Sequence, residues 1–182
     1  MIFPLTRRNR RVDTIAAVYG AIVAQARSPL FYRDYRVPDT VDGRLAMIVL
    51  HLALLLRRLA AEGPEMRAFG QRVFDRFCQD MDDNLREMGV GDLAVPRQMH
   101  RIGECFYGQV AAYDRALTSP AATDLEQVLA RNIFGRPSAA ETAQLALYMR
   151  QAASQLASSD VASIADGVVE FPDPLAALKP LI

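Results

Sequence analysis

The densest cluster of side chains that could bind or react lies on a charged segment in the middle of the chain. Asp80, Asp83 and Glu87 are spaced to share one face of a helix, where carboxylates could hold a metal ion. Di-iron sites of helical bundles also use a histidine three residues after a glutamate, and neither His51 nor His100 stands there. The acids also lie opposite the apolar stripe of their segment, as on a solvated face with i,i+4 ion pairs. We therefore predict no metal or catalytic site here.

The other reactive side chains also favour structural roles. His51 lies in an apolar run and fits a buried imidazole. Cys78 and Cys105 lie near the inner faces of their segments, where small apolar groups pack, and their spacing suits neither a disulfide framework nor a zinc knuckle. Nucleophile-elbow, zinc-protease, P-loop and dinucleotide motifs are absent from the sequence. We therefore predict a protein that is not an enzyme and has no cofactor.

The elements that must position these side chains are predicted to be helices. The chain has 182 residues, enough for one domain with a core, and 51% of them are hydrophobic. Alanine and leucine far outnumber valine and isoleucine, which favours helix over strand. The 21 basic and 21 acidic residues cancel, which argues against a nucleic-acid partner. We predict an all-α, single-domain helical bundle.

Apolar residues at helical spacing and the stop signals between them predict six principal helices. Four should cover about residues 13–27, 42–61, 65–88 and 96–117, and two should open at the capping boxes Thr123–Glu126 and Ser138–Glu141. The second helix is apolar nearly all round, and its apolar run, Leu45–Leu56, is too short to span a bilayer, so this helix should be the most buried. We expect a basic segment at 1–12, a helical domain at 13–157 and an irregular tail at 158–182.

Particular positions sharpen this prediction. Met88 is expected to close the inner stripe of the third helix. Gly103 and Gly108, inside the fourth helix, indicate close packing of another backbone there, because a glycine at such a position is destabilising.

The N-terminus has a form that a secretory signal would also show. A basic stretch precedes an apolar one, and Ala24-Gln25-Ala26 resembles a signal-peptidase site. Asp13 interrupts this pattern and the apolar stretch lacks leucine, so we predict a retained amphipathic helix. The basic stretch is expected to contact an anionic membrane surface through four residues: Arg7, Arg8, Arg10 and Arg11.

Several segments of the sequence match a known family. FYRDYRVPDTVDGRL (Phe31–Leu45), LHLALLLRRL (Leu50–Leu59) and QRVFDRFCQDMDDNLREMGVGDLAVP (Gln71–Pro96), followed by FYG (Phe106–Gly108), closely resemble the ubiquinol–cytochrome c chaperone family. Its members are assembly factors of the cytochrome bc1 complex. The resemblance is strongest over residues 31–117, about half the chain.

The resemblance implies a non-enzymatic chaperone that binds newly made cytochrome b and promotes assembly of the bc1 complex. It also implies a small assembly partner protein, as in mitochondrial relatives. Arginine-rich usage and a short N-terminus indicate a bacterial chain, expected in the cytoplasm with peripheral contact at the inner face of the plasma membrane.

Client binding is expected at charged residues within the matching pattern that no core requires: Asp80, Asp82, Asn84, Arg86, Glu87 and Asp92. An alternative is that Asn84 and Arg86 only tie the helix to the loop after it. Two other functions also stay open. One is a lipid- or small-molecule-binding helical domain at the membrane surface, and the other is a helical enzyme that uses the acidic cluster.

Overall fold

A computed structural model of the chain describes residues 5–135 and 139–178, with the backbone alone at 5–13 and 139. In the described part no strand occurs and six helices have eight or more residues, which confirms the predicted all-α bundle. The elements are α1 (Leu5–Ala26), α2 (Pro29–Arg33), α3 (Val41–Ala60), α4 (Pro64–Glu87), α5 (Val95–Thr118), α6 (Ala122–Leu129), the π-helical turn η1 (Ala130–Phe134), α7 (Ala139–Ser158), α8 (Val161–Ala165) and α9 (Pro174–Ala177).

Helix α3 forms the centre of the bundle and packs against α1, α4, α5 and α7. It begins at Thr40, whose hydroxyl accepts a hydrogen bond from the Gly43 amide at 3.1 Å. Position 43 must lack a Cβ, because that atom would lie 2.0 Å from the Pro38 carbonyl oxygen. Most residues of α3 are buried, more than in any other helix of the described chain, which confirms the prediction.

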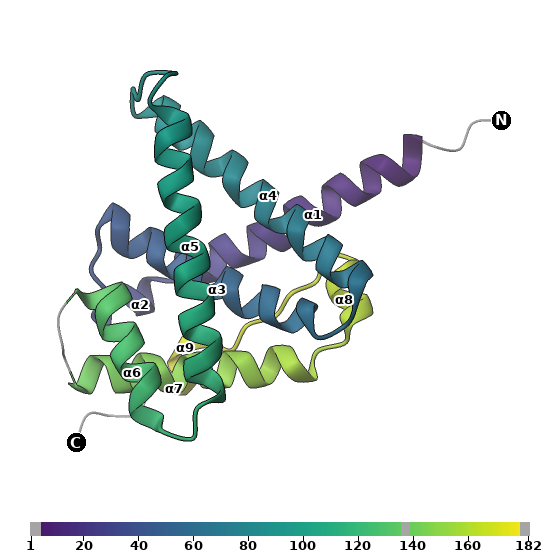
Figure 1. Ribbon diagram of the computed structural model, residues 1–182. Coiled ribbons are helices and arrows are strands. Elements are labelled where there is room, and N and C mark those ends of the chain that lie inside the picture. Colours follow the sequence, from purple (N-terminus) through teal and green to yellow (C-terminus); the bar gives the residue numbers. More distant parts are fainter. Residues whose placement is uncertain (1–4, 136–138, 179–182) are drawn as a thin grey trace.

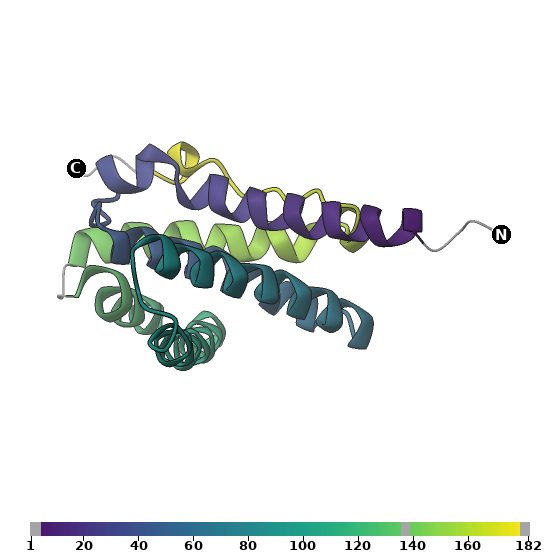
Figure 2. The same cartoon turned by 90° about the horizontal axis from the view of Figure 1, so that it is seen from above.

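The other helices surround α3 and leave two parts projecting. From above, α1 and the C-terminal segment lie on one side, α5 and α6 on the opposite side, and α7 between them (Figure 2). The hairpin of α4 and α5 extends beyond the rest at its tip, and the first turns of α1 extend away in another direction (Figure 1).

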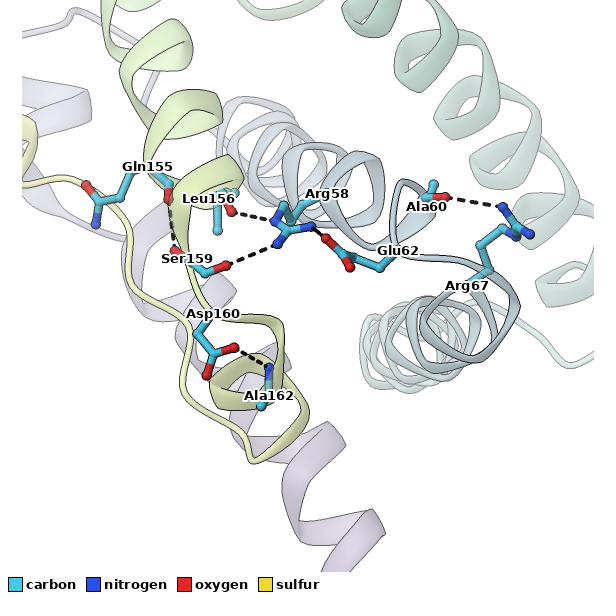
Figure 3. A network of polar contacts seen from close by, with 9 residues as sticks. All are labelled: Arg58, Ala60, Glu62, Arg67, Gln155, Leu156, Ser159, Asp160 and Ala162. Atoms are coloured by element: carbon cyan, nitrogen blue, oxygen red, sulfur yellow. Dashed lines mark hydrogen bonds and ion pairs between the residues drawn. The ribbon is translucent and has the colours of Figure 1, made fainter.

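Two arginines at the end of α3 join it to other helices. Arg58 donates to the carbonyl oxygens of Leu156 at 2.7 Å and Ser159 at 3.1 Å, and it also pairs with Glu62 (Figure 3). These carbonyls lie in the last turn of α7 and just after it, where the helix dipole favours a cation. Arg57 forms an ion pair with Asp114 of α5 at 2.8 Å. The paired arginines therefore fasten the C-terminal end of α3 to α5 and α7.

The C-terminal residues are more ordered than the sequence indicates. They contain α8 and α9, capped by the carboxylates of Asp160 and Asp173. We call residues 167–178 the strap, because they run along the bundle (Figure 1) and bury Pro174 and Ala177. The proline-rich sequence does not predict this order, because the strap has no periodic apolar pattern and is held by tertiary contacts.

Two predictions about element ends are wrong, and a third is not tested. Helix α1 begins at Leu5 instead of near Asp13, because a basic stretch can still be helical. Thr123 does not cap α6, which begins earlier, where the Ser119 hydroxyl accepts from the Ala121 amide at 3.2 Å. The Ser138 capping box lies outside the described residues.

Three predictions of inward-facing positions are also wrong. Met88 is 63% exposed because α4 ends at Glu87, and Cys105 is exposed while Cys78 is half-buried. A Cβ added at Gly103 or Gly108 would meet no described atom within 4 Å, so no other segment of the described chain packs there. Each glycine thus destabilises α5 by about 1 kcal/mol relative to alanine with no compensating contact in the described chain.

Candidate functional site

Five of the six predicted client-binding residues lie at the tip of the α4–α5 hairpin: Asp82, Asn84, Arg86, Glu87 and Asp92. Helix α4 closes there with two backbone hydrogen bonds, from Gly89 to the Arg86 carbonyl at 2.9 Å and from Val90 to the Leu85 carbonyl at 3.0 Å. Gly89 has φ of +82°, the left-handed conformation that this closure requires. The chain then turns through residues 90–94 into α5, so the hairpin tip, residues 82–94, stands apart from the bundle core (Figure 1).

Arg86 organises the charges of the hairpin tip. Its guanidinium donates to Asp82 at 2.6 Å and also pairs with Asp92 in the loop. The hydrogen bond and charge of Asp82, followed by the charge of Asp92, raise the pKa of Arg86. Arg86 therefore ties the helix to the loop. Asn84 does not, because its side-chain amide donates to the Asp80 carbonyl at 2.5 Å within the same helix.

Asp80 faces a different neighbour from the other predicted residues. It accepts a hydrogen bond from the Tyr19 hydroxyl of α1 at 2.8 Å, and Arg76 lies over the Tyr19 ring at 5.7 Å. Burial, followed by the Asp80 hydrogen bond and charge, raises the pKa of Tyr19. Asp80 therefore helps to hold α1 against α4, and the structure separates it from the charges of the hairpin tip.

The hairpin tip also exposes apolar side chains that the sequence did not identify. Leu93 is 98% exposed and Met88 63% exposed, beside the exposed carboxylate of Glu87. Between residues 80 and 95 stand five carboxylates and one guanidinium. A large apolar side chain that folding leaves in solvent beside unbalanced charge is typical of a binding surface. Leu93 could have been noticed as the one leucine in a connector of turn residues.

His51 forms the second candidate site, inside the bundle. Its ring is fully buried, with Nδ1 2.7 Å from the Met47 carbonyl and Nε2 2.8 Å from the Tyr148 hydroxyl. A carbonyl only accepts, so Nδ1 carries the proton and Nε2 accepts from Tyr148. The Gln25 amide donates to the Tyr148 oxygen at 2.9 Å and to the Pro172 carbonyl at 2.9 Å. Both ring nitrogens are therefore occupied within the protein.

Aromatic rings surround this imidazole and keep water out. Phe31 and Phe171 lie 5.5 Å and 5.0 Å from its centroid, Phe171 at 89° to its plane. Tyr35 donates to the Pro174 carbonyl of the strap at 2.8 Å, and burial raises its pKa to about 12. Burial lowers the pKa of His51 to about 4, because the charged imidazole is the form that burial disfavours. The hydrogen bond to the Met47 carbonyl opposes this shift only in part. His51 is thus a neutral structural residue that fastens α3 to α7, as predicted.

The next features concern membrane contact and metal binding. The side chains of Arg7, Arg8, Arg10 and Arg11 lie outside those described, so their contacts stay a prediction. Within residues 5–135 and 139–178, no helix is long and apolar enough to cross a membrane. The same residues contain no group of three or more histidine, cysteine or acidic side chains placed to hold a metal ion.

Known proteins resemble the chain over most of its length. The crystal structure of the Cbp3 homolog from Brucella abortus is 36% identical and superposes with a TM-score of 0.85, covering 96% of this chain and 98% of that one. Ubiquinol-cytochrome c reductase complex assembly factor 1 from Drosophila melanogaster is 28% identical over 85% of this chain and 62% of its own. The Xenopus laevis factor is 23% identical over 61% of this chain and 56% of its own.

The chain thus spans less than two thirds of the length of the curated relatives it matches. The family model described as "Ubiquinol-cytochrome C chaperone" matches residues 33–171, which include the hairpin tip, His51 with its partner Tyr148, and the first part of the strap. The chain therefore belongs to the ubiquinol-cytochrome C chaperone family.

Proposed function

We propose that this chain is a non-enzymatic chaperone that binds newly made cytochrome b during assembly of the bc1 complex, and that the hairpin tip is its client-binding surface. The observation that carries this proposal is the exposed Leu93 beside unbalanced carboxylates on a projecting hairpin. Membership of a family of assembly chaperones supports it.

The chemistry of the hairpin tip suits a membrane-protein client. Such a client has apolar spans, and its cytoplasmic loops carry an excess of lysine and arginine. Leu93 and Met88 offer apolar contacts, while the Glu87 carboxylate offers charge of the opposite sign to those loops. In this proposal Asp82 and Asp92 face the client too, Arg86 fixes their positions, and Asp80 and Asn84 support the helix behind them. A small partner protein is compatible with this surface.

Two substitutions test the surface without disturbing the core. Leu93→Asp and Glu87→Arg should each reduce the cytochrome b that co-purifies with the tagged chain at least tenfold. Both side chains are exposed, so the free energy of unfolding should stay within about 0.5 kcal/mol. The b-type haem absorbance and the amount of bc1 complex should fall as in a strain without the protein, while respiration through a quinol oxidase continues.

Matched controls come from the strap. Val168→Asp places the same charge on another exposed apolar residue, and Glu170→Arg reverses another exposed acid. Both controls should leave client binding unchanged. Normal bc1 levels in the deletion strain would rule out the chaperone function, whereas normal levels with both tip variants would rule out the hairpin tip as its client surface.

We further propose that the basic start of α1 contacts the inner face of the plasma membrane. Each arginine near an anionic surface adds about 1 kcal/mol of attraction. Replacing all four with glutamine (Arg7→Gln, Arg8→Gln, Arg10→Gln and Arg11→Gln) should abolish flotation of the protein with anionic liposomes, as high salt should in the unaltered chain. Unchanged flotation of the fourfold variant would contradict this contact.

A further inference from the structure

An apolar groove lies between α3 and α5, two helices that cross in Figure 1. A hollow of about 450 Å³ is lined mainly by small and apolar side chains, among them Leu54, Leu56, Val110 and Leu117. A second hollow of about 130 Å³ continues toward α4. Leu56, Ala60 and Tyr107 line both hollows, so the two are neighbours, and together we call them the groove.

Tyr107 stands between the two hollows and is 59% exposed. Its ring lies 5.6 Å from Phe74 and 5.7 Å from the buried Phe106, so one side of the ring is packed and the rest faces outward. The groove therefore presents an aromatic side chain in its middle, a residue type enriched in protein interfaces.

Helix α5 places one small residue on each side of this ring. Gly103, Tyr107 and Ala111 follow one another at intervals of four, so they share one face of the helix. Gly103 has open space where a Cβ would be, and Ala111 is exposed. Small residues that flank a groove let another helix approach closely, and the described chain supplies no such helix. In the described part of the chain, this face of α5 is therefore open to a helix of another molecule.

The charges around the groove have an excess of one sign. Arg57 and Asp114, which both line the larger hollow, form an ion pair at 2.8 Å. Arg67 lines the smaller hollow, where its side chain donates to the Ala60 carbonyl at 3.3 Å (Figure 3), and no carboxylate in the described part of the chain pairs with it. A partner with acidic side chains beside the smaller hollow would complement Arg67.

We propose that this groove docks one amphipathic helix of a protein partner, with its apolar stripe in the two hollows and acidic residues beside Arg67. From Gly103 to Leu117 helix α5 rises about 21 Å, so the partner segment needs about 14 residues. An apolar stripe laid into a groove is an established way to bind a helix. The surface is separate from the hairpin tip, so this proposal does not depend on the proposed client.

Cross-linking in the cells that make the full chain tests which occupant binds. A photoreactive benzophenone amino acid at position 107 should cross-link to a protein segment with apolar residues at helical spacing and acidic residues on its flank. The same probe at Val41, which is 72% exposed and lines neither hollow, should not. The proposal would be overturned by adducts with lipid, with a second copy of this chain or with an uninterrupted apolar span. It would also be overturned if position 107 gave no more adducts than the control position.

A synthetic peptide with the cross-linked sequence then tests the contact. Gly103→Leu fills the approach beside Tyr107 and should weaken peptide binding at least tenfold. Its melting temperature should not fall, because leucine favours a helix and has open space there. Gly20→Leu is the matched control, since Gly20 also lies inside a helix with open space, on α1, which has no residue in the groove.

The control should leave peptide affinity within about twofold. Equal affinities of the two leucine variants would overturn the groove as the binding site. Arg67→Glu tests the charge: it should weaken binding of this peptide and strengthen binding of a version whose acidic residues are replaced with lysine. An unchanged preference between the two peptides would overturn the acidic partner.

Discussion

Acidification from pH 7 to pH 4 is expected to lower the free energy of unfolding by about 3 kcal/mol through His51. Burial lowers the pKa of this imidazole to about 4 in the folded protein, whereas an unfolded histidine titrates near 6.5. Below about pH 6.5 the unfolded chain therefore binds a proton that the folded protein excludes. Stability falls as the pH falls through this window, and the contribution of His51 levels off below about pH 4. Urea unfolding at a series of pH values measures it.

His51→Asn provides the control for this titration. Asparagine keeps one donor and one acceptor but cannot take up a proton, so the variant should be less stable at pH 7 yet lose less stability on acidification. Carboxylates titrate in both proteins and cancel in the comparison. The difference between wild type and variant should shrink by about 3 kcal/mol between pH 7 and pH 4. Parallel pH profiles would show that His51 is not held neutral by the fold.

Phe171→Ala is expected to lower the free energy of unfolding by about 3 kcal/mol, the lower end for a phenylalanine deletion because the ring is only half-buried. Phe171 packs its ring at 89° to His51, so its removal also admits water to the imidazole. The pKa of His51 should then rise toward its ordinary value, and acid sensitivity should decrease. Urea unfolding measures the first effect, and proton NMR titration of His51 measures the second.

Val168→Ala is the control for this comparison. It shortens an exposed side chain of the same strap and should change stability by less than about 0.5 kcal/mol. A Phe171→Ala protein with unchanged stability and an unchanged His51 titration would mean that the strap does not cover the cluster.

The sequence was most informative where local pattern and burial agree. The amphipathic helix predicted after the basic stretch buries the stripe Ile15, Val18, Ile22 and Ala26, because helical periodicity directly reports which face meets the core. The burial of His51 followed from its apolar neighbours in the same way. Its partners did not, because Tyr148 and Phe171 lie far along the chain and only tertiary packing brings them there.

The candidate site was predicted only in part. Charged residues near Asp82 and Asp92 were identified by their place in a matching pattern, yet Asp80 separates from them because Tyr19 of α1 binds it. Leu93 was missed because a single leucine in a connector has no periodicity. Gly103 was wrongly expected to pack inside the chain. Sequence alone does not distinguish a glycine that packs against another segment from one that faces open space, as Gly103 does in the described chain.

The strap also determines when this protein finishes folding during synthesis. The Gln25 amide and the Pro172 carbonyl that it binds are 147 positions apart in sequence. At about 5–20 residues per second, the ribosome makes the second about 7–30 s after the first. During that interval the strap does not yet cover His51 and the aromatic residues made early, Phe31 and Tyr35. The native core is therefore completed late in translation, and until then the chain exposes apolar surface that other proteins in the cell can bind.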